Sequence, residues 1–260
     1  MVGHAYVKSG PVMAEIIHIE IKILGKGGHG SEPSKCHDPI QPAIDIHNYV
    51  RELIKRYEKR KINFRLTMPH IEAGSACNVI PDTAFLEGTF RSFDEKLSKE
   101  FVKEFSQKID EFCEKYSCQN EKNIKTLYPA LINSEKETKS ILKTAIEYFG
   151  AENVDDKVLP IYASEDFAYY MKEKPGTFVF LCSAKTKNDG YLHTANFNFN
   201  DELIPVASEF WIKIAEDKLG IDRKVFNIEN LGSKRKAMKK PKPKQSVTLR
   251  KPSKKIKKKK

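Results

Sequence analysis

Hydrophobic and polar residues alternate strictly from Glu15 to Leu24, with four isoleucines on one face and His18, Glu20 and Lys22 on the other. Successive side chains of a strand point to opposite faces, so this pattern predicts a half-buried strand with one solvated side. The glycine-rich string at 25–30 should end that strand in a flexible loop.

From Pro39 the period of the hydrophobic residues changes. Apolar residues through Tyr57 follow helical spacing, with Asp38 as the expected N-cap and Pro39 at the first helical position. The pattern then predicts strands at 62–69 and 79–91, a helix over about 95–116 and a strand around 124–132. The order strand, helix, strand, strand, helix, strand is that of a split βαβ, ferredoxin-like arrangement with both helices on one face of an antiparallel sheet.

After Asn133 the pattern is typical of a different layer structure. It predicts a helix over about 135–149, strands at 158–162 and 177–182, a short helix after Ser164, and a closing helix at 201–219 with Asp201 as N-cap. The second strand is almost continuously apolar, as expected of a strand buried on both faces.

These elements are too few to close an α/β domain alone. We therefore expect an incomplete α/β domain, made of residues 1–14 and 133–220, with the ferredoxin-like domain of residues 15–132 inserted in it. Residues 221–260 should form a linker and a disordered basic tail.

The net charge of +11 does not describe the folded part. Residues 233–260 hold 15 Lys or Arg and no acid, so the rest of the chain has 31 basic and 35 acidic residues, a net of −4. Binding of nucleic acid by the whole protein is therefore not indicated.

The five cysteines are odd in number and irregularly spaced, which favours free thiols over a disulfide framework or a zinc finger. No apolar leader segment and no stretch approaching the ~18 apolar residues of a membrane span is present. We expect a cytoplasmic protein.

Four residues could carry chemistry: His29 in its glycine loop, Asn78, Arg91 and His193. Glycines that allow positive φ suit a loop that presents His29 to a ligand, but a solvent-facing turn histidine is the alternative. Arg91, at a strand end, could grip a carboxylate in bidentate fashion or form a surface salt bridge. A lone histidine such as His193 is more often structural than a metal ligand.

Glu165 lies in the string Ser-Glu-Asp-Phe at 164–167, which is explained by a helix N-cap with acids in the first turn. The chain has no HExxH, no phosphate-binding glycine loop and no GxSxG. Nothing in the chain alone brings together three metal ligands.

Several ordered strings nevertheless match one family. They are Ser-Gly-Pro-Val-Met-Ala at 9–14, Gly-Lys-Gly-Gly-His-Gly at 25–30 with Asp-Pro-Ile at 38–40, Cys-Asn-Val-Ile-Pro-Asp at 77–82, Glu-Gly-Thr-Phe-Arg-Ser-Phe at 87–93, Ser-Glu-Asp-Phe-Ala-Tyr-Tyr at 164–170, Pro-Gly-Thr at 175–177, Leu-His-Thr at 192–194 and Phe-Asn-Asp-Glu at 199–202. As a set they resemble the metal-dependent amidohydrolases of the aminoacylase and carboxypeptidase type, in the branch of hippurate hydrolase and the indole-acetyl-amino-acid hydrolases.

The resemblance implies a two-metal catalytic domain with an inserted lid or dimerisation domain, and hydrolysis of N-acyl or N-aroyl amino acids. His193 would match the last metal-binding histidine, for zinc or manganese. His29 would match the lid histidine that reaches the neighbouring subunit's site to stabilise an oxyanion. Asn78 and Arg91 would hold the substrate carboxylate, and Glu165 would be an acid near the site.

The chain also departs from the family pattern. The N-terminal third of the family's members carries a Cys-Gly-His-Asp-Gly-His string and paired glutamates. This part has no counterpart in the present sequence, so we expect an N-terminally truncated member. In the lid loop the family's Pro-His is Pro33-Ser34. One ligand cannot fix a cation in a defined geometry, so the chain is expected to be inactive alone.

Two functions therefore remain open for the chain. The first is the amidohydrolase activity of a full-length parent, with a homodimer formed through the lid. The second is a non-catalytic dimerisation module. The basic tail could be a nuclear-import string, a sequence-blind contact with polyanions such as anionic lipid or RNA, or a solvated extension without a role.

Overall fold

The computed structural model describes residues 2–184 and 192–221. The chain forms two compact units, residues 1–214 and residues 215–260, and the sites described below lie in the first. In the described ranges, no helix combines the length and the apolar character needed to cross a membrane.

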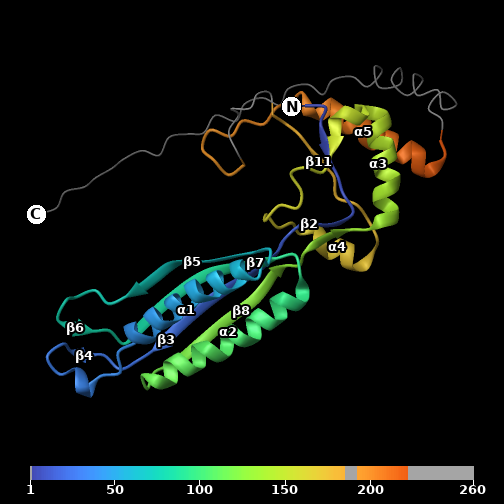
Figure 1. Ribbon diagram of the computed structural model, residues 1–260. Coiled ribbons are helices and arrows are strands. Elements are labelled where there is room, and N and C mark those ends of the chain that lie inside the picture. The colour runs from blue at the N-terminus through green and yellow to red at the C-terminus, as the bar shows by residue number, and fades with distance from the viewer. Residues whose placement is uncertain (1, 185–191, 222–260) are drawn as a thin grey trace, which may run out of the picture. The chain divides into compact units, whose positions relative to one another are not determined.

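The first unit contains a four-stranded antiparallel sheet with the strand order β5-β7-β3-β8 (Figure 1). Its strands are β3 (Glu15–Leu24), β5 (Phe64–Ala73), β7 (Thr83–Ser92) and β8 (Gln119–Tyr128). Helix α1 (Ile40–Lys59) connects β3 to β5, and α2 (Glu95–Lys115) connects β7 to β8. Each connection skips one strand, which is the split βαβ topology. The predicted ferredoxin-like fold is confirmed, and we call residues 15–128 the lid.

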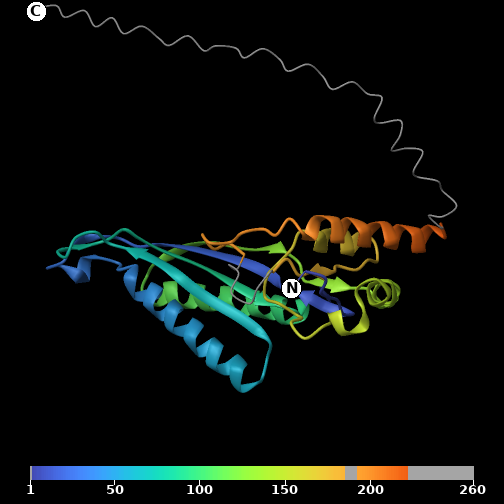
Figure 2. The ribbon, with the colours of Figure 1, turned by 90° about the horizontal axis from the view of Figure 1, so that it is seen from above.

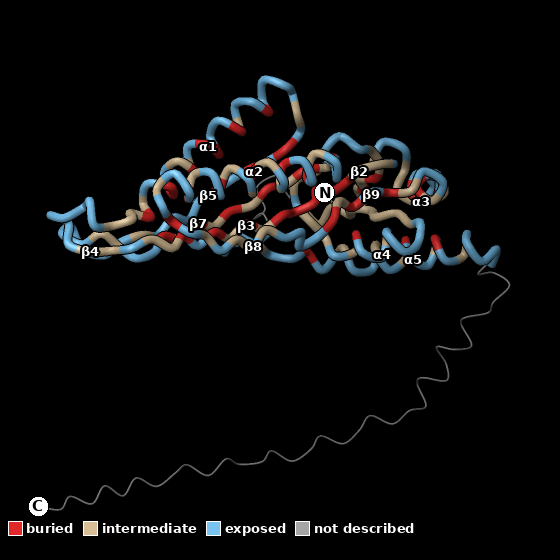
Figure 3. Tube along the Cα trace, turned by 90° about the horizontal axis from the view of Figure 1, so that it is seen from below, coloured by how far each residue is buried: buried red, intermediate tan, exposed pale blue. Residues whose placement is uncertain are grey.

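The core of the lid lies between the sheet and its two helices. Four of the five isoleucines of β3, at positions 17, 19, 21 and 23, are 0–2% exposed. They pack with Leu86 and Phe90 of β7 and with Phe101 and Phe105 of α2. The rings of Phe90 and Phe101 stack with centroids 4.1 Å apart. Both helices lie on one side of the sheet (Figure 2). The buried residues therefore follow the strands in alternation, as the tube in Figure 3 shows.

The ends of several lid elements differ from the predictions. The strand predicted at 79–91 is divided into β6 (Val79–Ile80) and β7 by Pro81 and Asp82. The strand predicted around 124–132 is divided in the same way into β8 and β9 (Leu131–Asn133). Proline lacks the N–H that a continuous ladder needs, and Pro81 and Pro129 lie in the two interruptions.

Short strands and three helices make up the rest of the first unit. β1 (Ala5–Tyr6) pairs with β10 (Val154–Asp155) and β11 (Phe180–Leu181), and β2 (Gly10–Met13) pairs with β9. The helices are α3 (Glu135–Phe149), α4 (Phe167–Glu173) and α5 (Leu203–Leu219), of which α5 continues into the second unit. Residues Ile141 and Ala145 of α3 form a small core with Phe210 and Ile214 of α5.

Three predictions for this part are wrong in detail. No strand forms at 158–162, where Pro160 removes a donor and Ile161 makes only an isolated bridge to Met13. The apolar segment 177–182 is half-buried rather than buried on both faces, and only β11 within it is a strand. Helix α5 begins at Leu203 rather than at Asp201, and in the turn before it the Asn200 side chain accepts a hydrogen bond from the Glu202 N–H at 3.2 Å.

All five cysteines are free thiols, as predicted. Burial raises the pKa of Cys113 to about 11, so this thiol is a core side chain rather than a nucleophile. The division of the chain into a lid inserted between two parts of one α/β domain stays a prediction.

Candidate functional site

His29 and Asn78 meet at one end of the lid. Strand β4 (Gly28–His29) pairs with β6, so that His29 lies opposite Val79, and the Gly30 N–H donates to the Asn78 carbonyl at 2.8 Å. Both residues are exposed. We call this β4–β6 end the tip of the lid; it extends beyond the last residues of the main sheet (Figure 1).

The hydrogen bonds of His29 define its tautomer. The backbone N–H of Ser31 donates to Nδ1 of His29 at 3.2 Å, and the Ser31 hydroxyl lies 2.8 Å from the same atom. A backbone N–H can only donate, so Nδ1 is the unprotonated nitrogen and Nε2 carries the proton. His29 therefore presents an N–H donor at the tip, which is the group that a developing oxyanion requires.

The glycines around His29 have a different role from the one predicted. Positive φ angles are found at other glycines, but not at 25, 27, 28 or 30. A Cβ added to Gly27 would lie 2.5 Å from the Ile80 carbonyl oxygen. The tip thus needs glycine because two backbones approach closely, not because the loop is left-handed.

Arg91 lies at the opposite end of β7 from the tip. Its Nη1 donates to the Tyr162 carbonyl at 2.8 Å and to the Ser164 hydroxyl at 3.2 Å. Burial lowers the pKa of its guanidinium, which nevertheless stays charged at neutral pH. The ten residues of β7 span about 30 Å, so a single chain does not bring Arg91 near His29 and Asn78.

Glu165 follows Ser164 and is half-buried just before α4. Burial, and then the neighbouring Asp166 carboxyl, raise the pKa of Glu165 above its ordinary value. The N-cap of α4 is Asp166, without a side-chain capping bond, so the acids precede the helix rather than occupy its first turn as predicted. Because Ser164 accepts a hydrogen bond from Arg91, its chain neighbour Glu165 lies near Arg91.

His193 is exposed and has a positive φ of 64°. This backbone conformation is strained for a residue with a Cβ and is concentrated at sites where structure and function constrain the chain. Among the described residues, the only set of three His, Cys, Asp or Glu side chains close enough to share an ion is His18, Glu20 and Glu87. The residues described here therefore do not form a two-metal centre around His193.

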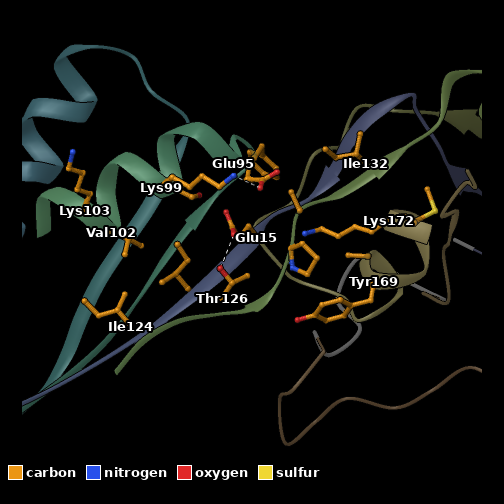
Figure 4. Close-up of a pocket in the computed structure, with 17 residues that line it drawn as sticks. Glu15, Glu95, Lys99, Val102, Lys103, Ile124, Thr126, Ile132, Tyr169 and Lys172 are labelled. Atoms are coloured by element: carbon orange, nitrogen blue, oxygen red, sulfur yellow. Dashed lines mark hydrogen bonds and ion pairs between the residues drawn. The ribbon is translucent and has the colours of Figure 1, made fainter. Parts of the chain in front are cut away.

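A cavity of about 710 Å³ lies between α2, β8 and α4, and none of the predicted site residues lines it (Figure 4). Its wall holds Glu15, only 6% exposed, whose Oε1 accepts from Thr126 at 3.0 Å. Oε2 of Glu15 and the hydroxyl of Ser98 are buried without a hydrogen-bond partner among the described residues. In the sequence, Glu15 falls on the isoleucine side of the two-residue repeat, and a carboxylate on that side is the signal that could have found it.

Comparisons with known proteins agree with the fold and with these motifs. Residues 15–117 match the model of a peptidase dimerisation domain, M20_dimer. The chain is 30% identical over 214 residues to hippurate hydrolase of Campylobacter jejuni, covering 81% of this chain and 54% of that protein. It is 31% identical over 215 residues to N-acetylcysteine deacetylase of Bacillus subtilis, covering 82% and 55%.

Two solved structures are similar over most of the chain. A putative aminohydrolase from methicillin-resistant Staphylococcus aureus has a TM-score of 0.71 at 25% identity, covering 83% of this chain and 56% of that one. A dinuclear metal-binding peptidase of the M20 family from Bacillus subtilis has a TM-score of 0.64 at 26% identity, covering 82% and 52%. The chain thus spans about half the length of the relatives that it matches. It carries an M20 peptidase dimerisation domain at residues 15–117 and is a homologue of the M20 amidohydrolases.

Proposed function

We propose that this chain supplies the lid and the carboxylate-binding residues of an amidohydrolase. The substrate class is N-acyl or N-aroyl amino acids, or small peptides, and the bond cleaved is the amide. The observation that carries the proposal is the separation of two groups on one lid: His29 with Asn78 at the tip, and Arg91 about 30 Å away at the other end of β7.

Each group suits one part of such a substrate. Both hydrogen bonds that Arg91 makes to described residues come from Nη1, and the guanidinium fork has further N–H groups for a substrate carboxylate. His29 presents Nε2–H, and Asn78 lies beside it. An N–H donor of this kind stabilises the oxyanion that develops when an amide carbonyl is attacked.

The two groups can serve one substrate only if they come from different subunits. We propose a homodimer in which the tip of one lid reaches the Arg91 end of its partner. A two-fold axis would then create two equivalent sites, each with His29 from one subunit and Arg91 from the other.

The metal of the proposed enzyme is zinc or manganese, with His193 as one ligand. The other ligands and the base that activates water are not found among the described residues near His193. We therefore assign this chain substrate binding and oxyanion stabilisation, and no step at the metal. Glu165, with its raised pKa, is proposed as an acid bordering the Arg91 end of the site.

Mixed dimers test the proposal. The chain is joined to the metal-binding half of the Campylobacter jejuni hippurate hydrolase, and hydrolysis of hippurate-like amides is measured. His29→Ala and Arg91→Ala should each reduce kcat/KM by at least about tenfold, since each removes a charge-stabilising contact.

Co-refolding the two inactive variants should restore about a quarter of the activity, because half of the dimers are mixed and each mixed dimer keeps one intact site. A mixture that stays inactive while mixed dimers form would contradict the shared site. Arg51→Ala, which changes an exposed residue of α1, is the control for activity lost during refolding.

A non-catalytic dimerisation module is the second candidate function. It is favoured by the lack of a metal cluster at His193 among the described residues and by large exposed side chains on α5, where Trp211 is 61% and Ile204 54% exposed. A chain that dimerises, yet gives no hydrolysis on any N-acyl amino acid after the joining experiment, would select this candidate.

We further propose that the protein works in the cytoplasm and that its basic tail contacts polyanions non-specifically. The support is compositional, because 15 basic residues lie within residues 233–260. The nuclear-import alternative for this tail rests on the same residues. All of them lie outside the part of the chain that the structure describes.

A further inference from the structure

The solvent-facing side of the lid sheet, opposite the two helices, carries a cluster of imidazoles and carboxylates. His18 and Glu20 come from β3, Glu87 from β7 and His70 from β5. Nε2 of His18 lies 2.9 Å from Oε1 of Glu87, and Nδ1 of His18 lies 3.9 Å from Oε2 of Glu20. Nδ1 of His70 lies 3.2 Å from the second oxygen of Glu87.

Backbone register builds this cluster. Glu20 lies directly opposite Glu87, and Glu87 directly opposite His70, so the three form one row across three strands. The register of β5 against β7 shifts by one residue between Thr67 and His70. Without that bulge, His70 would pair with Leu86, which points into the core; the bulge moves the imidazole onto the solvent-facing side.

Gly88 makes the bulge possible. A Cβ at Gly88 would lie 2.2 Å from the Thr67 carbonyl oxygen and 2.9 Å from the Met68 sulfur. Any other residue would therefore have to displace the bulged backbone of β5. The position of His70 beside Glu87 thus depends on a glycine one residue away from Glu87.

The row has an electrostatic cost in the absence of a cation. Two carboxylates directly opposite each other on an antiparallel pair destabilise the sheet. Lys22, on the same face, has its ammonium 3.5 Å from Glu121 instead, and Lys125 of β8 lies opposite His18. His18, located between Glu20 and Glu87, is the group that bridges them.

We propose that His18, Glu20 and Glu87 bind a zinc-class divalent cation on the solvent-facing side of the lid sheet. One ligand atom from each of the three lies within 4.8 Å of the others. Tetrahedral zinc with bonds of about 2.0–2.2 Å needs such atoms roughly 3.3 Å apart, so the side chains must rotate toward one another on binding. Imidazole nitrogen and carboxylate oxygen are both zinc ligands, and three protein ligands leave a fourth position for water.

His70 acts through Glu87 rather than as one of the three ligands. Its contact with the second oxygen of Glu87 orients the carboxylate so that the other oxygen faces His18. Asn123 donates to Oε2 of Glu20, which is the same oxygen that faces His18. Such supporting contacts hold ligands in place before the cation binds. This site shares no residue with the one proposed around His193, and a cation here would clamp β3 to β7.

Zinc titration of the full chain tests the site. Metal-free protein is titrated with zinc chloride by calorimetry, and cobalt(II) absorption reports the coordination geometry. We expect the wild type to bind zinc at micromolar concentration or tighter, and His18→Ala and Glu87→Gln each to weaken this binding at least about 100-fold. His70→Ala should weaken it by about tenfold, as expected of a supporting residue.

Two matched controls separate this site from others. Glu121→Gln removes an exposed carboxylate of the same sheet and should leave zinc binding unchanged. Glu32→Gln, at an exposed carboxylate of the lid outside this sheet, should also leave it unchanged. Zinc should raise the Tm of the wild type but not of His18→Ala, while circular dichroism confirms that each variant is folded. Equal zinc affinity of wild type and His18→Ala, or no binding by the wild type, would overturn the proposal.

Discussion

The guanidinium of Arg91 donates a hydrogen bond from Nη1 to the carbonyl oxygen of Tyr162, over 2.8 Å. Arg91 belongs to β7 of the lid, and Tyr162 lies 71 positions later, in the segment before α4. The Tyr162 ring in turn packs under the guanidinium of Arg65, whose carbon lies 4.0 Å from the ring centroid. Two arginines from neighbouring lid strands therefore hold one residue outside the lid.

Arg91→Ala should destabilise the fold, in addition to the effect on the proposed substrate binding. A hydrogen bond from a charged group contributes about 1.5–3 kcal/mol, so we expect the free energy of unfolding to fall by about that amount. Urea denaturation followed by circular dichroism measures it. Arg91→Lys should retain less than half of the stabilisation, because an ammonium cannot match the guanidinium fork. An Arg91→Ala chain as stable as Arg51→Ala would show that the contact has no net effect.

The contact between Tyr49 of α1 and Glu104 of α2 should make stability depend on pH. The Tyr49 hydroxyl donates to Glu104 at 2.5 Å, and Arg56 donates to the same oxygen. Burial opposes ionisation of Glu104, but these two donors outweigh it and hold the pKa of Glu104 below its ordinary value.

A lowered pKa in the folded state favours folding above the ordinary pKa of Glu, and this stabilisation is lost as pH falls through the folded pKa. Tyr49→Phe should therefore cost about 1 kcal/mol at pH 7 and clearly less near pH 3, measured by urea denaturation at both values. Tyr148→Phe is the matched control, because its hydroxyl donates to the backbone carbonyl of Val206 at 3.3 Å, a group that does not titrate. An equal cost of Tyr49→Phe at both pH values would contradict the assignment.

Gly88→Ala should be among the most destabilising single-methyl changes in the chain. The new Cβ would lie 2.2 Å from a backbone oxygen of the β5 bulge, which cannot move without breaking the ladder. We expect a loss of about 1–3 kcal/mol, the usual cost of forcing extra atoms into a packed site.

Gly176→Ala serves as the control for Gly88→Ala in thermal unfolding. There the nearest atom is the Met171 sulfur at 2.8 Å, part of a flexible side chain that can move away. If the two variants unfolded at the same temperature, the bulge would be more adaptable than the geometry of Thr67 and Met68 indicates.

Deleting residues 233–260 should abolish retention on heparin at low salt. The 15 basic residues removed leave a chain with a net charge of −4 over residues 1–232. Retention of the full chain should fall steeply as salt increases, because binding to a polyanion releases counterions. Circular dichroism and the oligomeric state should stay unchanged. Comparable heparin retention by the shortened chain would mean that a surface of the folded part binds polyanions.

Local sequence patterns were sufficient for the elements of the lid. The alternation of isoleucines in β3 depends only on the two-residue repeat of a strand, and the spacing along α1 and α2 only on the helical repeat. The order of these elements, with chain connections that must skip a strand, then leads to the split βαβ sheet. These inferences hold because each rests on neighbours in sequence.

Contacts between residues far apart in the sequence could not be predicted from local patterns. The strand predicted at 158–162 does not form, since its pairing depends on partners beyond the segment and Pro160 lacks a donor. The tip that joins His29 to Asn78, and the length of β7 that separates both from Arg91, follow from pairing between strands.

The sequence by itself determined the lid fold, the family resemblance and the concentration of positive charge in the tail. Only the tertiary structure decided that Glu20, Glu87 and His70 form one row, because a one-residue bulge reverses which face a side chain occupies. It also decided that Glu15, a carboxylate that the two-residue repeat places on the isoleucine face of β3, is buried beside a cavity. Periodicity describes one strand at a time, whereas register and burial are properties of several strands packed together.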